Sequence, residues 1–467
     1  MSSPPVPNDL PAPAPGKKIW RNGTLVYTSG GLAALFLLLL IGDFALAMRD
    51  RSIGPMAQWY LSHLGVPNIL FAILLSSFPA ALSLLLGPII SFKSDRLRSR
   101  WGRRIPFLLV TTPLAAFGMI GVAVTPLVAD WVHGHFPEQD ALVIAVLCFG
   151  VFWALYEFAT IIGGAVFGGL VNDVVPRELL GRFYGLFRAI SLIDGMIFNY
   201  WIMGKVPDHF TLILVIIGVF YGSVFLWVCF KVKEGDYPPP PPQPEPVPGR
   251  EKRLFTGFKA GASTYFRECF TNPYYLSVFL MLMVAGLSFG PINTFAIPYA
   301  NSLGVDMNVY GKYLALTYLI SLCLSFFLGW LADRFHPLRM AMFMLAGYTA
   351  VTAWGAVFAT TPDTFLVAWV LHGVLSGSFF TSAASLGQRL YPKSRFAQFA
   401  SAAGIVGALA GMVLAPSVGL LIDQSGKIYR YTFVIACVLS LLALACAFFV
   451  YGKFKKLGGP DNYVAPE

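Results

Sequence analysis

Long apolar stretches separated by short polar segments dominate this sequence and limit what it can fold into. A bilayer core is about 30 Å thick, so a helix that rises about 1.5 Å per residue crosses it in about 20 residues. Within lipid every backbone polar group must be paired inside the segment, which makes apolar runs of this length helices. We predict twelve spans, at 24–48, 69–91, 105–128, 141–168, 184–204, 210–230, 274–299, 311–332, 339–359, 364–388, 397–422 and 431–451.

The composition supports a membrane protein. Hydrophobic residues make up 57% of the chain and charged residues only 12%, half of the roughly 25% found in soluble globular proteins. The net charge of +10 would suit a nucleic-acid partner, but the basic residues lie in loops that flank the apolar runs. Membrane orientation explains them better, and we expect no nucleic acid. The six cysteines show no C-x-x-C spacing, so we expect no metal site.

The spans fall into two sets of six. Most of the 33 Lys and Arg lie in segments that share one side of the membrane, which predicts that both termini are cytoplasmic and favours a bacterial inner (plasma) membrane. The linker begins with a proline-rich spacer and continues as a predicted amphipathic stretch. We predict a disordered cytoplasmic tail without signal-peptide features (1–23), an N-terminal bundle (24–230), a cytoplasmic linker (231–273), a C-terminal bundle (274–451) and a cytoplasmic tail (452–467).

A basic loop between the second and third spans has a partial copy in the second half. The first copy, GPIISFKSDRLRSRWGRRIP, runs from Gly87 to Pro106, and the second, GWLADRFHPLRM, runs from Gly329 to Met340. From charge alone the first copy could be only a topological marker. Its recurrence at the same place in both halves favours a functional role.

These two loops resemble the G-x-x-x-D-R-x-G-R-R loop of the major facilitator superfamily. The string SDRLRSRWGRRIPF is similar to the glycoside-pentoside-hexuronide symporters of the melibiose permease type and to sucrose-transporter-like sugar:cation symporters. The resemblance implies an all-α polytopic membrane protein of twelve transmembrane helices in two six-helix bundles, with a substrate site between them. It also implies a gating role for Asp95, Arg96, Arg103, Arg104, Asp333 and Arg334.

Ionisable residues inside the spans are candidates for the chemistry, because charge in a bilayer is costly. Glu157 shares a helical face with Trp153, and Tyr156 lies about 100° away, an arrangement typical of sugar stacking and hydrogen bonding. The alternative is a buried glutamate that is satisfied by Arg188, the only base that we place inside a span, with Trp153 as packing. Asp43 and Asp194 complete the set of charged candidates.

The family resemblance assigns roles to some of these residues. Glu157 and Arg188 look like the sugar-binding carboxylate and arginine of the fourth and fifth spans, and Asp43 resembles a sugar-contacting aspartate of the first span. Sodium-coupled members carry aspartates where this chain has Ser83 and Gly87. We therefore expect a proton on Asp43, Glu157 or Asp194 as the coupling ion, rather than sodium, and no cofactor.

The second half offers weaker candidates. Asn293 lies near Pro291, where a kinked helix is expected to line the cavity. His372 either binds substrate or is a hydrogen-bonded residue within the bundle. No P-loop or nucleophile–base pattern predicts an enzyme. We predict a monomeric secondary active transporter, in the lipid bilayer, for proton-coupled symport of a sugar or glycoside; the alternative is a non-transporting assembly factor or sensor on the same fold.

Overall fold

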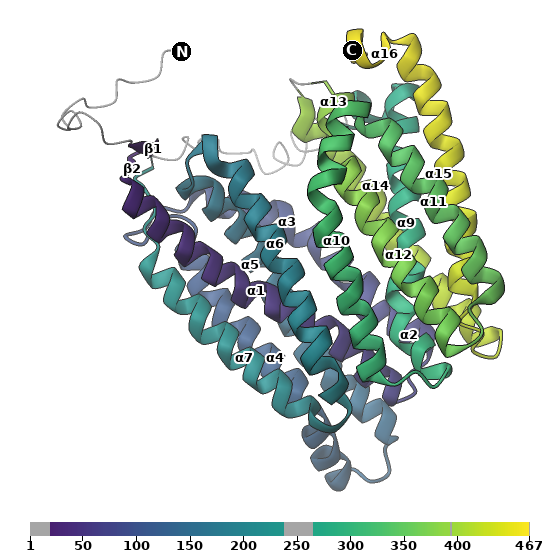
Figure 1. Cartoon of the computed structure of the whole chain (residues 1–467). Helices are drawn as coiled ribbons and strands as arrows, with labels where there is room; N and C mark the ends of the chain where they lie inside the picture. Colours follow the sequence, from purple (N-terminus) through teal and green to yellow (C-terminus); the bar gives the residue numbers. More distant parts are fainter. Residues whose placement is uncertain (1–18, 238–264, 393–394, 467) are drawn as a thin grey trace, which may run out of the picture.

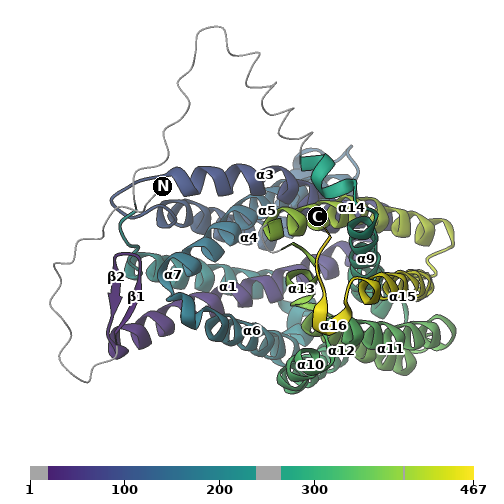
Figure 2. The ribbon, with the colours of Figure 1, turned by 90° about the horizontal axis from the view of Figure 1, so that it is seen from above.

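The computed structural model describes residues 19–237, 265–392 and 395–466. The helices form two bundles side by side, an N-terminal and a C-terminal one (Figures 1 and 2). The short strands near the start of the chain and the last short helix lie at the same end of the molecule, which we call the termini end (Figure 1). The opposite end is the distal end. The proline-rich part of the predicted linker lies outside the described residues.

The N-terminal bundle begins with a β-hairpin and continues with helices interrupted by two π-helical turns. Its hairpin pairs Trp20 with Tyr27 in antiparallel register. The elements are β1 (Trp20–Asn22), β2 (Leu25–Tyr27), α1 (Ser29–His63), α2 (Asn68–Ala72), the π-helix η1 (Ile73–Ser77), α3 (Phe78–Arg96), α4 (Ile105–His135), α5 (Ala141–Val174), the 3-10 helix η2 (Arg177–Leu179), α6 (Leu180–Ile197), the π-helix η3 (Phe198–Ile202), the 3-10 helix η4 (Met203–Lys205) and α7 (Val206–Lys231).

The C-terminal bundle consists of long helices and two short ones at the termini end. Residues 265–270 form a helical turn before it. The elements are α9 (Pro273–Ser302), α10 (Met307–Phe335), α11 (Pro337–Phe358), α12 (Pro362–Ala383), α13 (Leu386–Leu390), α14 (Phe396–Gln424), α15 (Tyr431–Lys456) and α16 (Gly459–Asn462).

The number of membrane passes agrees with the sequence. Eleven helices among the described residues are long and apolar enough to span, and one of them, Arg177–Lys231 with 55 residues, contains both α6 and α7. Figure 1 shows α6 and α7 as separate rods that meet at the distal end, so the chain makes twelve passes. The predicted all-α fold with twelve helices in two bundles is confirmed.

The first helix differs most from its predicted bounds. We predicted a span at 24–48 after a disordered tail, whereas residues 20–22 form β1 and α1 runs from Ser29 to His63. Thr28 caps the start of α1, since its Oγ1 accepts a hydrogen bond from the backbone N–H of Gly31 at 3.2 Å. The charged residues after Met48, which we took as the end of the span, lie inside the helix.

One hydrophobic core joins the two bundles, and each bundle has a second core of its own. The shared core includes Phe71 of α2 and Phe295 of α9, whose rings stack with centroids 5.7 Å apart. Phe295 is also the point where α9 departs from helical geometry, between Pro291 and Pro298. The separate cores lie within the C-terminal and N-terminal bundles.

Candidate functional site

A cavity of about 260 Å³ lies between the two bundles and is lined from both. Arg51 of α1 and Arg188 of α6 line it from the N-terminal bundle. Asn293 of α9, Tyr318 of α10 and Trp369 of α12 line it from the C-terminal bundle. We call it the central cavity. Its position between the bundles is the one that the sequence predicts for a substrate site.

A second cavity of about 300 Å³ adjoins the first inside the N-terminal bundle, and Gln58 lines both. Trp153, Tyr156 and Glu157 of α5 line this side cavity together with Asp50 of α1. The structure thus brings together three of the predicted site residues. Two of the others, Arg188 and Asn293, lie in the central cavity.

The rings beside Glu157 are already engaged. The Trp153 indole stacks on Tyr156, with centroids 5.5 Å apart, and its Nε1 donates to the backbone oxygen of Leu74 in η1 at 2.9 Å. Both side chains are buried. In this conformation the tryptophan has its polar atom paired and holds α5 against η1.

Arg188 does not reach Glu157, so the alternative in which Arg188 satisfies a buried Glu157 is not observed in the structure. The two side chains line different cavities, and no ion pair joins them among the described residues. The charges that act on Glu157 come instead from Asp50 and Arg49 of α1. Arg49 donates from Nε and Nη2 to Oδ1 of Asp50 at 2.8 and 2.6 Å, and its guanidinium lies 5.9 Å from the ring centroid of Tyr156.

The charged segment Arg49–Arg51 was not predicted as part of the site. Arg49 is only 3% exposed and also lies over the ring of Tyr221, 4.6 Å from its centroid, so Arg188 is not the only base inside a span. The signal was present in the apolar residues that follow. Ile53, Met56, Ala57, Tyr60 and Leu61 are buried and recur with the spacing of one helical face.

Arg51 is held across the interface between the bundles. Its Nη2 donates to Oγ of Ser191 at 2.8 Å and its Nε donates to the backbone oxygen of that residue at 3.2 Å. Nη1 donates to the hydroxyl of Tyr318 at 3.3 Å, and the guanidinium lies 5.0 Å from the centroid of that ring. This arginine therefore contacts α6 and α10 at the wall of the central cavity.

Asp43 and Asp194 lie outside both cavities. Asp194 is 0% exposed, and neither of its carboxyl oxygens has a hydrogen-bond partner in the described part of the chain. The Oδ2 of Asp43 is also buried without a partner. Asp43 and Arg51 are close enough to Asp194 for their charges to act on it.

His372 is a buried residue that positions Asn293. Its Nε2 lies 3.1 Å from Oδ1 of Asn293 and its Nδ1 lies 2.9 Å from the hydroxyl of Tyr348. Since Oδ1 can only accept, Nε2 donates to it. The structure therefore places His372 behind the cavity wall rather than in the lining.

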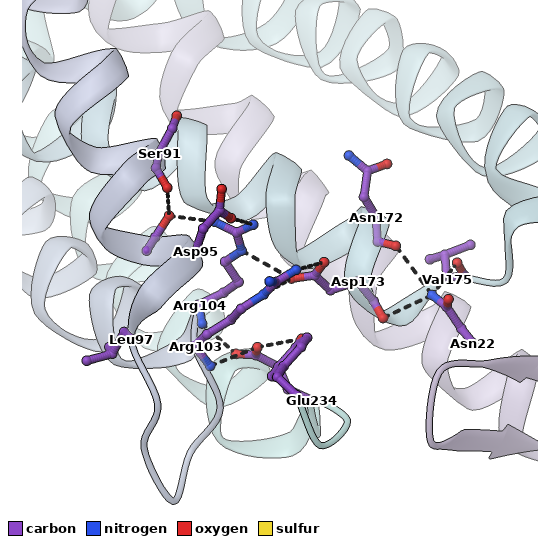
Figure 3. A network of polar contacts seen from close by, with 12 residues as sticks. Asn22, Ser91, Asp95, Leu97, Arg103, Arg104, Asn172, Asp173, Val175 and Glu234 are labelled. Carbon is purple, nitrogen blue, oxygen red and sulfur yellow. Dashed lines mark hydrogen bonds and ion pairs between the residues drawn. The ribbon is translucent and has the colours of Figure 1, made fainter. Parts of the chain in front are cut away.

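The basic loop between α3 and α4 forms a network at the termini end (Figure 3). Arg104 pairs with Asp95, and its Nη1 donates to Oγ of Ser94 at 2.5 Å. Arg103 donates to both oxygens of Asp173 at 2.5 and 2.9 Å, and Nε of Arg104 donates to the same carboxylate at 3.1 Å. The hydrogen bonds to Asp173 raise the pKa of the Arg103 guanidinium. Asp173, at the end of α5, is a member that sequence reasoning missed.

Glu234 is the second residue of this network that was missed. Its carboxylate accepts hydrogen bonds from the backbone N–H groups of Arg103, Arg104 and Ile105 at 3.0, 2.8 and 2.8 Å, at the start of α4. Gly102 has φ +101°, and a Cβ there would lie 2.4 Å from the Glu234 carboxyl carbon. Only glycine fits this close approach.

The second copy of the loop repeats one contact of the first. Arg334 lies over the rings of Trp330 and Phe335, with its guanidinium carbon 5.4 and 5.8 Å from their centroids. Arg96, in the first copy, lies 4.1 Å from the centroid of Phe92. The side chain of Asp333 lies outside the described residues. In both copies the arginine that follows the aspartate therefore lies over an aromatic ring four residues before it.

Comparisons with protein families match the two halves separately. Residues 278–462 match the family described as Major Facilitator Superfamily, and residues 60–246 match the family described as PUCC protein. An uncharacterized symporter of Synechocystis sp. is 28% identical over 222 residues, a match that spans 44% of this chain and 38% of that protein.

Solved structures show the same fold along most of the chain. An inward-facing, unoccupied bacterial homologue of the human lysosomal transporter Spinster has a TM-score of 0.65 at 13% identity, covering 93% of this chain and 99% of that one. The inward-open xylose transporter of E. coli has a TM-score of 0.62 at 12% identity, covering 88% and 95%. These proteins are transporters by their descriptions, and their structures confirm the predicted major facilitator fold of this chain.

Proposed function

We propose that this chain is a secondary active transporter of the major facilitator superfamily that works by alternating access; the fold and the match of residues 278–462 support the superfamily. The observation that carries the proposal is the central cavity, because both bundles line it and both contribute polar side chains. A rocking motion of one bundle against the other would expose such a cavity to each side in turn.

Contacts between the bundles at the distal end support a gate there. The Asp423 carboxylate of α14 accepts hydrogen bonds from the backbone N–H groups of Asn68 and Ile69, both at 3.0 Å, at the start of α2. A Cβ on Gly419 would lie 2.4 Å from the backbone oxygen of Asn68, so the helices approach as closely as glycine permits. With both termini in the cytoplasm, as the basic loops predict, this conformation is inward-open.

Asp194 is the proposed proton carrier. A buried carboxylate without a hydrogen-bond donor is costly, so the acid form suits its surroundings. Arg51 lines the central cavity and its charge acts on Asp194, while Asp43 lies near the same group. Substrate that binds Arg51 would weaken the pull of this charge on the carboxyl group, which links occupancy of the cavity to the proton.

A sugar or glycoside is the proposed cargo. The resemblance of the basic loop to sugar symporters supports it, as does the fold shared with the xylose transporter of E. coli. Proton-driven symport in a bacterial inner membrane, by a monomer, is the form that we propose. The absence of aspartates at Ser83 and Gly87 supports a proton rather than sodium.

Uptake into proteoliposomes tests the proposal. Purified protein in liposomes with an inward proton gradient is expected to accumulate one or more of a panel of labelled pentoses, hexoses, disaccharides and sugar acids, and a protonophore should abolish the accumulation. Protein-free liposomes are the control. Uptake driven by a sodium gradient rather than by a proton gradient would contradict the proposal that the proton is the coupling ion.

A second candidate function keeps some support. The match of residues 60–246 is to a family whose description names no transport activity. A membrane assembly factor or sensor would show no flux with any member of the panel and would copurify with a stable partner from native membranes. That combination of results would reject transport.

A further inference from the structure

The lining of the central cavity contains positively charged hydrogen-bond donors but no carboxylate. Arg51 and Arg188 both line it, and no Asp or Glu does. Neither arginine forms an ion pair among the described residues. Arg188 is exposed to the cavity, and Arg51 is close enough for the two positive charges to repel each other. The cavity therefore carries two positive charges, and no carboxylate in its lining pairs with them.

Trp369 adds an independent observation. Its side chain is only 6% exposed, and its Nε1 has no hydrogen-bond partner in the described part of the chain. The indole lines the central cavity and stacks on Tyr310, with centroids 5.8 Å apart. An indole N–H can only donate, and a buried donor without an acceptor is costly. The Trp369 N–H is therefore available to an acceptor on a bound ligand.

Asn293 presents the same chemistry. His372 occupies the carbonyl oxygen of its amide, which leaves the amide nitrogen as the end available to the cavity. Guanidinium, indole and amide N–H groups from four helices thus converge on one space. Carboxylate and phosphate oxygens are the groups that such donors bind best, and arginine binds them in pairs of hydrogen bonds.

The transport cycle gives a further reason for the cargo to be negatively charged. In an occluded conformation the cavity is sealed from water on both sides, and two guanidinium groups without a carboxylate partner in the lining would be buried there. A neutral cargo would leave that cost uncompensated. An anionic cargo neutralises it.

We propose that the cargo is an organic anion whose carboxylate or phosphate is bound by Arg51 and Arg188, with its body against Trp369. This inference rests on the proposed transport function, because it names the substrate class for the same cavity. It narrows the cargo from sugars in general to acidic ones, or to other small organic acids.

Matched acid and neutral ligands test the charge directly. The probes are D-glucuronate against D-glucuronamide, D-glucose 6-phosphate against D-glucose, and benzoate against benzamide, each titrated at constant ionic strength into the full-length purified protein while its unfolding temperature is recorded. At least one acid should bind about tenfold or more tightly than its neutral partner. The glucuronate and phosphate arms tell a carboxylate cargo from a phosphorylated one.

Single substitutions test whether a preference for acids over neutral ligands depends on the residues that line the cavity. Arg188→Gln, at a side chain that forms no ion pair, should weaken the binding of that acid on the order of 10–100-fold, and Arg188→Lys should retain part of it. Trp369→Phe keeps an aromatic side chain and removes the indole N–H, so it should weaken the binding of the acid more than the binding of its neutral partner. Arg182→Gln, exposed on the same helix outside the lining, is the matched control.

Three results would overturn the anion site: no acid of the set binds, neutral partners bind as tightly as the acids, or Arg188→Gln leaves acid affinity unchanged. Failure of transport is distinct from these. Acid binding without flux in proteoliposomes would reject the transporter and keep the site, whereas flux of a neutral sugar that Arg188→Gln does not affect would keep the transporter and reject the site.

Discussion

His336 connects α10 to α11 at the termini end, and its buried ring is held by contacts with α11 and with α15. Its backbone has φ +75°, its ring lies against Phe454 with centroids 4.7 Å apart, and its Nδ1 accepts the backbone N–H of Leu338 at 3.2 Å. Burial, together with the positive charges of Arg389 and Arg339, lowers the pKa of His336 to about 4. A neutral ring is therefore part of the folded structure.

This histidine should make the stability depend on pH. Its pKa in the folded state lies below the unfolded value of about 6.5, so acid protonates the unfolded chain first. The contribution, up to about 3 kcal/mol, is present above pH 6.5 and is lost as the pH falls towards 4. His336→Asn, a residue that tolerates positive φ, should flatten the unfolding temperature between pH 6.5 and 4.5. An unchanged slope in the variant would assign the dependence to other groups.

Asp194 offers a second test at the scale of a residue. Asp194→Asn keeps the size of the side chain and removes the acid, so counterflow exchange of substrate should persist while accumulation driven by a proton gradient is lost. Both are measured in the same proteoliposomes. Equal loss of exchange and accumulation would instead assign Asp194 to binding or folding. Asp208→Asn, outside the bundle interior, is a control.

At the scale of elements, the α3–α4 loop is tied to the N-terminal bundle. Asp173 at the end of α5 and Glu234 in the segment after α7 hold it there. The hairpin joins the same corner, since Asn22 Nδ2 donates to the backbone oxygens of Asp173 and Val175 at 2.9 Å each. This corner would move as one unit when the bundles rock.

The two aspartates of the network should differ in their contribution to stability. The Asp173 side chain is 12% exposed and contacts two arginines, whereas that of Asp95 is 55% exposed and contacts one. Asp173→Ala should cost about 1–3 kcal/mol, because it leaves partly buried arginines unpaired. Asp95→Ala should cost less than about 1 kcal/mol. Unfolding temperatures of the purified variants compare them.

Asp95→Ala should nevertheless impair transport while the protein remains in the membrane, since the family resemblance of the loop implies a gating role for Asp95. Uptake normalised to membrane-inserted protein is the measurement. Wild-type uptake in this variant would count against a gating role, and the loop would then be a topological marker only.

At the scale of the whole molecule, the distal contacts decide which face of the cavity is open. Besides the Asp423 contacts, Asn301 Nδ2 of α9 donates to Oγ of Ser62 in α1 at 3.2 Å, and the Tyr429 hydroxyl donates to Oδ1 of Asn68 at 3.1 Å. Transport requires all of these contacts to break in the opposite conformation.

Crosslinking the distal end should therefore arrest the cycle. A Ser62→Cys, Asn301→Cys double variant joined by a short bis-methanethiosulfonate reagent should lose uptake and regain it after reduction. Each single variant treated in the same way controls for the six native cysteines, which are free thiols. Full uptake in the crosslinked protein would mean that the distal end does not open.

The sequence by itself determined the helices and their order. Because lipid cannot pair backbone polar groups, the apolar runs had to be helices, and α4, α7, α9 and α15 begin within four residues of their predicted positions. Residue types inside the spans also pointed to Glu157, Arg188 and Asn293 before any contact was known. These features can be predicted because they depend only on the residues within each segment.

Only the tertiary structure decided which charges meet. From the sequence, Arg49 and Arg51 looked like the end of a span. In the structure Arg49 is buried against the rings of Tyr156 and Tyr221, and the half-buried Arg51 lies over the ring of Tyr318. The pairing of Arg103 with Asp173, 70 residues away, follows from the packing of distant segments. Ion pairs depend on distances of a few ångströms between segments far apart in the chain, which hydropathy and local motifs do not contain.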